Sequence, residues 1–321
     1  MARIFVNKTI GREWWLRAGL CVASALFACA CASLSRPPEA GRPRAAGPPY
    51  PVILGASEER RDRALAAWTT LADASGARPL SEPELQPVTA TLRALPSTTP
   101  AASLRLPKVG GEGAAQTEEE LREALRRFIA DAAPLLGVVP AELSLVERTD
   151  NADSTRRALY RQRPFLYPLR GGYGVLEINF TPDLRVNAIN STAIPDTERL
   201  RRALANVRTQ LTLLTAKEAA LRLAGRTVAY RDGAGAEQTL SIPSGEEVSV
   251  REMVVYPLRS ADDPNSLALH LAWEASVGRT SPLLVYVDAV TGDTLAASAP
   301  ASPDPDKAPP RQAATPQSLP F

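Results

Sequence analysis

The chain has 321 residues, of which 45% are hydrophobic, with 37 Lys and Arg against 35 Asp and Glu. This composition is typical of a folded protein of one or two domains and excludes a chain that is disordered throughout. The single histidine excludes every site that needs two imidazoles, including the HExxH zinc peptidases. The balanced charge leaves no basic stripe, so we predict no nucleic-acid partner.

The amino terminus predicts export. Residues 1–17 carry four basic side chains against one acidic side chain, and the uncharged apolar run Ala18 to Ala28 follows. This run is too short for a transmembrane helix, and its basic flank and small residues are typical of a signal peptide over residues 1–28. All three cysteines lie within the first 31 residues, so the exported part contains neither a disulfide nor a thiolate nucleophile.

The end of the apolar run predicts a lipid anchor. Leu26–Ala28 before Cys29 resemble the bacterial lipobox, in which a signal peptidase cuts before the cysteine and its sulfur is acylated. Cys31 is the alternative acylation site, and ordinary cleavage after Ala30 or Ala32 is the alternative process. We therefore expect a protein of the bacterial cell envelope, anchored by lipid to the outer membrane or on the periplasmic face.

Proline-rich segments are expected to flank the folded part. Residues 29–56 and residues 299–321 both combine many prolines with small residues. Neither segment can bury enough apolar surface to fold alone. We predict an extended tether and a disordered tail.

Helices are predicted at the start of the folded part. Residues 58–75 place apolar side chains at helical spacing, and residues 81–95 are assigned a short helix. Thr117 and Glu120 form a capping box that begins a further helix. Between these helices we expect a loop with a strand at Ser103–Pro107.

Antiparallel strands are predicted next, at Glu142–Arg148, Arg156–Arg163, Tyr173–Phe180 and Leu184–Ile189. The last two form a hairpin around Thr181-Pro182-Asp183. We expect alternate residues of the returning strand, namely Leu184, Val186 and Ala188, to face the core.

A second unit repeats this order. Residues 195–212 are either a helix or a linker, and Thr215 with Glu218 forms another capping box. Strands are predicted at Gln238–Ile242, Arg251–Leu258, Leu267–Glu274, Pro282–Asp288 and Thr294–Ala297. Strands grouped after a helix predict an α+β fold. We expect two modules, over residues 57–194 and 195–298, each with a helix packed on an antiparallel sheet.

These elements resemble a known family. Arg161-Gln162, Gly171-Gly172 and the predicted hairpin are similar to the first propeptide module, called FTP, of thermolysin-like metalloproteases. Thr215–Ala220 resembles the opening helix of a PepSY domain, and the turn made by Asp288, Ala289, Thr291 and Gly292 resembles its final turn. The resemblance covers residues 117–297. It implies cystatin-like, PepSY-like modules, which in the proteases assist folding and inhibit the enzyme until cleavage.

Two features depart from the family. Phe165-Leu166-Tyr167-Pro168 stands where the family has Gly-Val-Pro-Val, and no catalytic domain follows in the sequence. We expect a binding module rather than an enzyme, without cofactor, metal or catalytic residue. Its expected partner is a secreted or envelope metallopeptidase, which it would inhibit or regulate. The alternative is a structural or interaction lipoprotein of the envelope with no role in proteolysis.

Three groups of polar residues have competing interpretations. His270 alternates with leucines, which favours a half-exposed strand position over catalysis. Asp288 and Asp293 suit turn chemistry, with Gly292 at positive φ, or alternatively a calcium site.

The third group consists of arginines, namely Arg156, Arg157, Arg161 and Arg163. We interpret it as a basic strand edge, which either prevents edge-to-edge aggregation or docks a partner. Binding of the partner is expected to use sheet edges or the tail, in the mode of β-augmentation.

Overall fold

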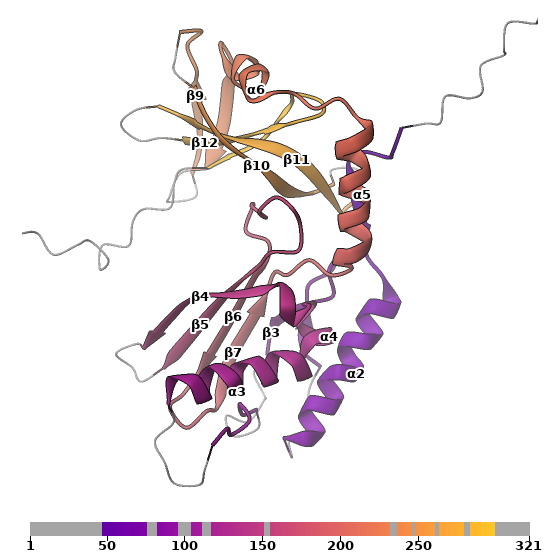
Figure 1. Ribbon diagram of the computed structural model, residues 1–321, viewed down its shortest axis with the longest axis vertical. Helices are drawn as coiled ribbons and strands as arrows, with labels where there is room; N and C mark the ends of the chain where they lie inside the picture. Colours follow the sequence, from indigo (N-terminus) through magenta and orange to yellow (C-terminus); the bar gives the residue numbers. More distant parts are fainter. Residues whose placement is uncertain are drawn as a thin grey trace, which may run out of the picture. The chain divides into compact units, whose positions relative to one another are not determined.

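The computed structural model describes residues 47–75, 82–95, 104–110, 117–150, 155–231, 236–245, 248–260, 263–278 and 283–298. Over these residues the protein is α+β, as predicted, with helices and mostly antiparallel sheets (Figure 1). The predicted signal peptide, most of the tether and the tail lie outside the described residues. No described helix is long and apolar enough to cross a membrane.

The elements before residue 192 are β1 (Val52–Gly55), α2 (Glu58–Ala74), β2 (Glu84–Leu85), β3 (Leu92–Ala94), α3 (Glu118–Asp131), α4 (Ala133–Leu136), the 3-10 helix η1 (Pro140–Glu142), β4 (Leu143–Asp150), β5 (Arg156–Gln162), β6 (Val175–Phe180) and β7 (Val186–Ser191). The later elements are α5 (Thr197–Gln210), α6 (Ala216–Leu223), β8 (Thr227–Arg231), β9 (Glu237–Ser241), β10 (Val248–Arg259), β11 (Ser266–Val277), β12 (Leu283–Asp288) and β13 (Thr294–Ser298).

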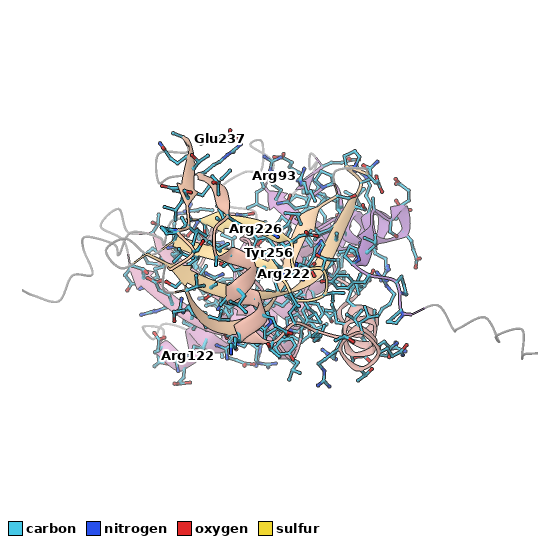
Figure 2. All side chains as sticks on the ribbon, turned by 90° about the horizontal axis from the view of Figure 1, so that it is seen from above. Arg93, Arg122, Arg222, Arg226, Glu237 and Tyr256 are labelled. Atoms are coloured by element: carbon cyan, nitrogen blue, oxygen red, sulfur yellow. The ribbon has the colours of Figure 1, made fainter. Side chains whose placement is uncertain are left out.

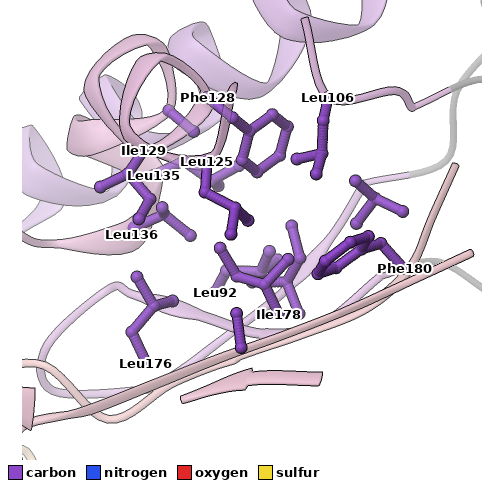
Figure 3. Close-up of a cluster of buried hydrophobic side chains, with 14 of the residues drawn as sticks. Leu92, Leu106, Leu125, Phe128, Ile129, Leu135, Leu136, Leu176, Ile178 and Phe180 are labelled. Atoms are coloured by element: carbon purple, nitrogen blue, oxygen red, sulfur yellow. The ribbon is translucent and has the colours of Figure 1, made fainter. Parts of the chain in front are cut away.

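Besides the two-stranded pair β2-β3, the structure has a four-stranded and a seven-stranded sheet, called the smaller and the larger sheet below. The smaller sheet is an antiparallel meander in the order β4-β5-β6-β7. The predicted capping box begins α3, because Thr117 accepts from the Glu120 amide and Glu120 accepts from the Thr117 amide. One face of α3, which includes Leu125 and Phe128, packs on the inward residues of β6 (Figure 3). The amphipathic pattern of the helix and the alternation of the strand therefore meet in one apolar core.

The returning strand of the hairpin differs from the prediction. Val186 and Ile189 are buried, whereas Ala188 is exposed. The register shifts between Asn179 and Phe180 of β6, which indicates a bulge at this point. An extra residue reverses the direction of the side chains that follow it, so the predicted inward position of Ala188 is wrong.

Two predictions for residues 81–107 are corrected. The segment predicted as a short helix over residues 81–95 forms the strand pair β2 and β3 instead, and Pro83 and Pro87 are poorly compatible with a helix there. The strand predicted at Ser103–Pro107 reduces to a bridge between Arg105 and Arg185. Leu106 donates to the Leu184 carbonyl, so this segment covers the beginning of β7.

The larger sheet has the order β1-β11-β12-β13-β8-β9, and β10 pairs with the other edge of β11. Strand β1 lies within the residues predicted as tether, yet it pairs with β11. Strand β8 was not predicted from the sequence. The region predicted as helix or linker contains α5, and the predicted second capping box begins α6.

Helices α5 and α6 pack on one face of the larger sheet. Leu200 and Leu204 of α5 join the apolar cluster of Leu269 and Leu271, whereas Leu223 of α6 joins a cluster with the inward residues of β12. Because side chains alternate along β11, the residues between these leucines point to the opposite face. That face carries the polar residues described next.

Candidate functional site

The candidate site is the face of the larger sheet opposite α5 and α6. On β11 it carries His270, Ala272 and Glu274, as the alternation with leucines predicts. The cross-strand partners of these residues are Tyr256, Val254 and Glu252 on β10, and Asp288 and Tyr286 on β12. Ionisable and aromatic side chains from three adjacent strands therefore share one surface.

Two tyrosines meet at the centre of this face. The rings of Tyr256, labelled in Figure 2, and Tyr286 have centroids 4.5 Å apart, although β11 runs between their strands. They can meet because the residue beneath them is the small, fully buried Ala272. Burial, followed by the charge of Glu274, raises the pKa of Tyr286 to about 12. Both hydroxyls therefore stay neutral near neutral pH.

Asp288 connects three separate parts of the chain. Its Oδ2 accepts from the Tyr50 hydroxyl at 2.8 Å and contacts His270 Nδ1 at 2.7 Å. Its Oδ1 accepts from the amides of Val290 and Thr291, at 2.7 and 2.9 Å. The Asp288 carboxylate is almost fully buried, with 1% of its side chain exposed.

These contacts use the acceptor sites of a carboxylate, which number about four. Burial raises the pKa of Asp288, but the hydrogen bonds from His270 and from the two turn amides outweigh burial and leave the pKa below its ordinary value. Burial and the neighbouring Asp288 charge raise the pKa of Tyr50. The arrangement holds the carboxylate ionised and the phenol neutral, and its hydrogen bonds tie three segments of the chain together.

The turn after β12 has the predicted chemistry. Asp288 binds the amides two and three residues ahead of it, and Gly292 has a φ of 79°. Ala289 is fully buried, and the Thr291 hydroxyl accepts from the Asp293 amide. Within the part of the chain that the structure describes, no three His, Cys, Asp or Glu residues gather as a metal site.

Glu274 is a second buried carboxylate on the same face. Its Oε2 lies 2.7 Å from Arg170 Nε and its Oε1 lies 3.2 Å from Arg251, with 3% of its side chain exposed. Arg170 also pairs with Glu252. Arg170 belongs to the loop between β5 and β6, so this ion pair connects the loop of the smaller sheet to the larger sheet.

The arginines proposed for docking do not form a strand edge. Strand β5 pairs with β4 on one side and with β6 on the other, so it is an interior strand of its sheet. The strand order of a sheet depends on tertiary pairing, which the pattern of one strand does not reveal. The prediction of a basic edge is wrong.

The four arginines also differ in their surroundings. Arg157 pairs with Glu177 at 3.1 Å, and Arg156 lies 3.6 Å from Asp150. Arg161 and Arg163 are exposed. Arg157 and Arg161 share the outer face of the strand, whereas Arg156 points to the side of buried Ala158.

Sequence reasoning missed Tyr50 and Glu274. Tyr50 lies at the end of a proline-rich segment, and Glu274 looks like an ordinary outward strand position. Glu274 interrupts a strand whose neighbouring residues on both faces are apolar. This interruption was the one local signal that Glu274 is buried. Cys29 and Cys31 lie outside the described residues.

We compared the chain with models of protein families and with curated proteins. No protein-family model matches the chain, and no curated protein matches it significantly.

Proposed function

We propose that the chain is an exported, lipid-anchored binding module that inhibits or helps to fold a secreted or envelope metallopeptidase. It would be a stand-alone relative of the FTP and PepSY propeptide modules, each unit having a cystatin-like arrangement of helix and antiparallel sheet. In this proposal the chain contributes a binding surface and no catalytic group.

One observation carries the proposal. A helix with a capping box precedes an antiparallel meander twice in the chain, first with α3 and β4–β7 and then with α6 and β10–β13. In the second case the hairpin of β8 and β9 comes between the helix and the meander, and β8 pairs in parallel with β13. The Asp288 turn joins β12 to β13, the last two strands of the second meander. The order of elements, rather than any single motif, supports the family relationship.

The chemistry of the polar face also favours binding. The carboxylate oxygens of Asp288 are occupied by four donors, and both oxygens of Glu274 contact guanidinium groups. A general base needs an accessible lone pair within reach of a substrate proton. These two carboxylates instead hold the surface rigid, which reduces the entropy lost on binding a partner.

Capture and inhibition test the proposal together. The purified exported part would be used as bait for the metallopeptidases secreted by the same cells, and each captured enzyme would be assayed with the bait added. We expect a metallopeptidase to be captured and its rate to fall. Arg126→Ala, at an exposed position on α3, is the control for an unrelated surface change. Absence of capture together with unchanged rates would contradict the proposal, and envelope defects without altered proteolysis would favour a structural lipoprotein.

A further inference from the structure

The loop between β5 and β6 displays an apolar tip. Leu166 is 72% exposed, more than any other large hydrophobic residue in the described part of the chain. Its neighbours Phe165 and Tyr167 are only partly buried against the core beneath. Leu166 is thus the exposed member of a short apolar segment whose other two side chains rest on the core, and functional contacts are concentrated on loops of this kind.

Hydrogen bonds fix this loop at both ends. At its start the Arg163 amide donates to the Glu142 carbonyl, and Arg201 Nε donates to the Pro164 carbonyl, both at 2.7 Å. At its end the Val255 amide donates to the Pro168 carbonyl at 2.9 Å. The tip is therefore held in one conformation by a rigid frame.

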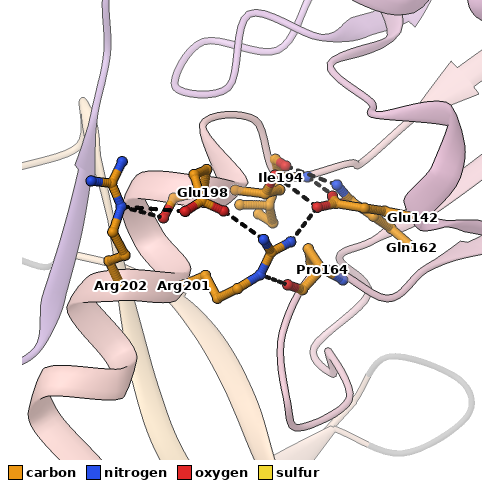
Figure 4. A network of polar contacts seen from close by, with 8 residues as sticks. Glu142, Gln162, Pro164, Ile194, Glu198, Arg201 and Arg202 are labelled. Carbon is orange, nitrogen blue, oxygen red and sulfur yellow. Dashed lines mark hydrogen bonds and ion pairs between the residues drawn. The ribbon is translucent and has the colours of Figure 1, made fainter.

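Arg201 is itself immobilised. Its guanidinium pairs with Glu142 and with Glu198, the latter at 2.6 Å, in the network of Figure 4. This arginine belongs to α5, and its hydrogen bond to Pro164 joins the helix to the loop. Because its charge is already matched by two carboxylates, it is not free to bind an anionic ligand.

A groove of about 130 Å³ lies between the loop and α5. Its apolar lining comprises the loop residues Phe165, Leu166 and Tyr167 together with Leu204, Val255 and Leu271. This volume is well below the roughly 300–1,000 Å³ of small-molecule pockets. It suits one large apolar side chain, and its concave form suits a protruding residue better than a flat bilayer.

The rim of the groove is positively charged. Arg208 of α5 lines it and is exposed, and it makes no ion pair with any residue that the structure describes. The backbone amides of Phe165, Leu166 and Tyr167 likewise donate to no described group. The groove thus offers an apolar socket beside an unmatched cation.

We propose that this groove docks an extended peptide segment of the partner protein in which a large apolar side chain stands next to a carboxylate. The apolar side chain fills the socket, and the carboxylate pairs with Arg208. Charge complementarity at Arg208 selects an acidic neighbour over a basic one. This inference names the docking surface of the proposed function and rests on it.

Blocked tetrapeptides provide the probes. Acetyl-Ser-Leu-Glu-Ser-amide would be titrated into the purified exported part by NMR, beside the same peptide with Lys in place of Glu and with Ser in place of Leu. We expect the Leu-Glu peptide to bind best and to shift the signals of the loop and of α5. Arg208→Glu should weaken it by at least about fivefold and reverse the preference between Glu and Lys.

Arg199→Glu is the matched control. It makes the same charge change at an exposed position of α5, nine residues earlier, which places it on the opposite side of the helix. We expect it to leave binding unchanged. Leu166→Ser should reduce binding of the Leu-Glu peptide while leaving the unfolding transition of this exposed site intact.

Several outcomes would overturn the inference. These are no binding by the wild type, equal binding by Arg208→Glu, or an equal loss in Arg199→Glu. Binding to vesicles of anionic lipid that Leu166→Ser abolishes, without peptide binding, would assign the surface to a membrane instead. If a peptidase is inhibited equally by wild type and Arg208→Glu, the docking surface is wrong and the proposed function stands; if no peptidase is inhibited, the proposed function itself fails.

Discussion

The two sheets are stabilised by different means. The smaller sheet packs an amphipathic helix on an apolar face, and the buried polar side chains of its strands are the uncharged Gln162 and Ser191. The larger sheet also has helices on one face, but its opposite face contains the buried carboxylates Asp288 and Glu274. There the connections run between distant residues, such as Tyr50 and Asp288, which are 238 positions apart.

This difference explains how the larger sheet holds segments from distant parts of the chain against it. Apolar packing joins neighbouring elements without regard to direction, whereas a buried carboxylate needs particular donors at particular positions. Asp288 fixes the segment before β1, and Glu274 fixes the loop after β5. Substitutions in the smaller sheet should therefore lower the free energy of unfolding most when they remove side-chain volume. Substitutions in the larger sheet should lower it most when they remove a charge or a hydrogen bond.

The largest expected effect is in the core of the smaller sheet. Phe128, which is 2% exposed, contacts both α3 and sheet residues in one cluster. Phe128→Ala should lower the free energy of unfolding by about 3–5 kcal/mol, because it removes buried apolar surface and leaves a cavity. Urea unfolding followed by circular dichroism measures this change. The exposed Arg126→Ala on the same helix should leave the transition where it is, and an equal loss in both would contradict the account.

Removal of a buried charge should have the next largest effect. Glu274→Gln leaves Arg170 and Arg251 without their shared carboxylate. Because both arginines keep some contact with solvent, we expect a loss of about 2–3 kcal/mol rather than the full cost of an orphaned buried charge. The matched change Glu252→Gln, at a carboxylate that is 49% exposed, should cost less than about 1 kcal/mol. Equal values in urea unfolding would show that the burial of Glu274 is unimportant.

The pH dependence of stability tests Asp288. Its pKa in the folded state is below the ordinary value of 3.8, so its ionised form stabilises the fold above about pH 4 and that contribution disappears as the pH falls through the folded-state pKa. Asp288→Asn should cost about 1–2 kcal/mol at neutral pH, and the difference from wild type should shrink on acidification. Unfolding curves at a series of pH values measure this. A difference that stays constant down to pH 2 would contradict the assignment.

The smallest expected effect is at the Tyr50 hydroxyl. Tyr50→Phe keeps the ring beside His270 and removes one donor to Asp288. We expect a loss of about 1 kcal/mol. Hydrogen exchange should show the loss locally, as faster exchange of the Leu271 amide, which donates to this hydroxyl at 3.1 Å. Unchanged exchange there would mean that the hydroxyl does not secure the segment before β1.

The comparison also explains which features the sequence could predict. Both capping boxes, the alternation on β11 and the Asp288 turn depend on residues a few positions apart, and all are present. The prediction that Ala188 faces inward is wrong because the bulge beside it depends on pairing between strands, which the sequence of one strand does not show. The contacts of Tyr50 and Glu274 join residues from distant segments, so their partners cannot be read from a single sequence. The position of β5 inside its sheet is hidden for the same reason.

The central claim is that this chain restrains a peptidase through binding. The most direct measurement is the steady-state rate of a captured metallopeptidase at a fixed concentration, titrated with the purified protein. The account predicts that the rate falls in proportion to added chain until the two are equimolar. A rate that stays constant through a large molar excess would contradict it.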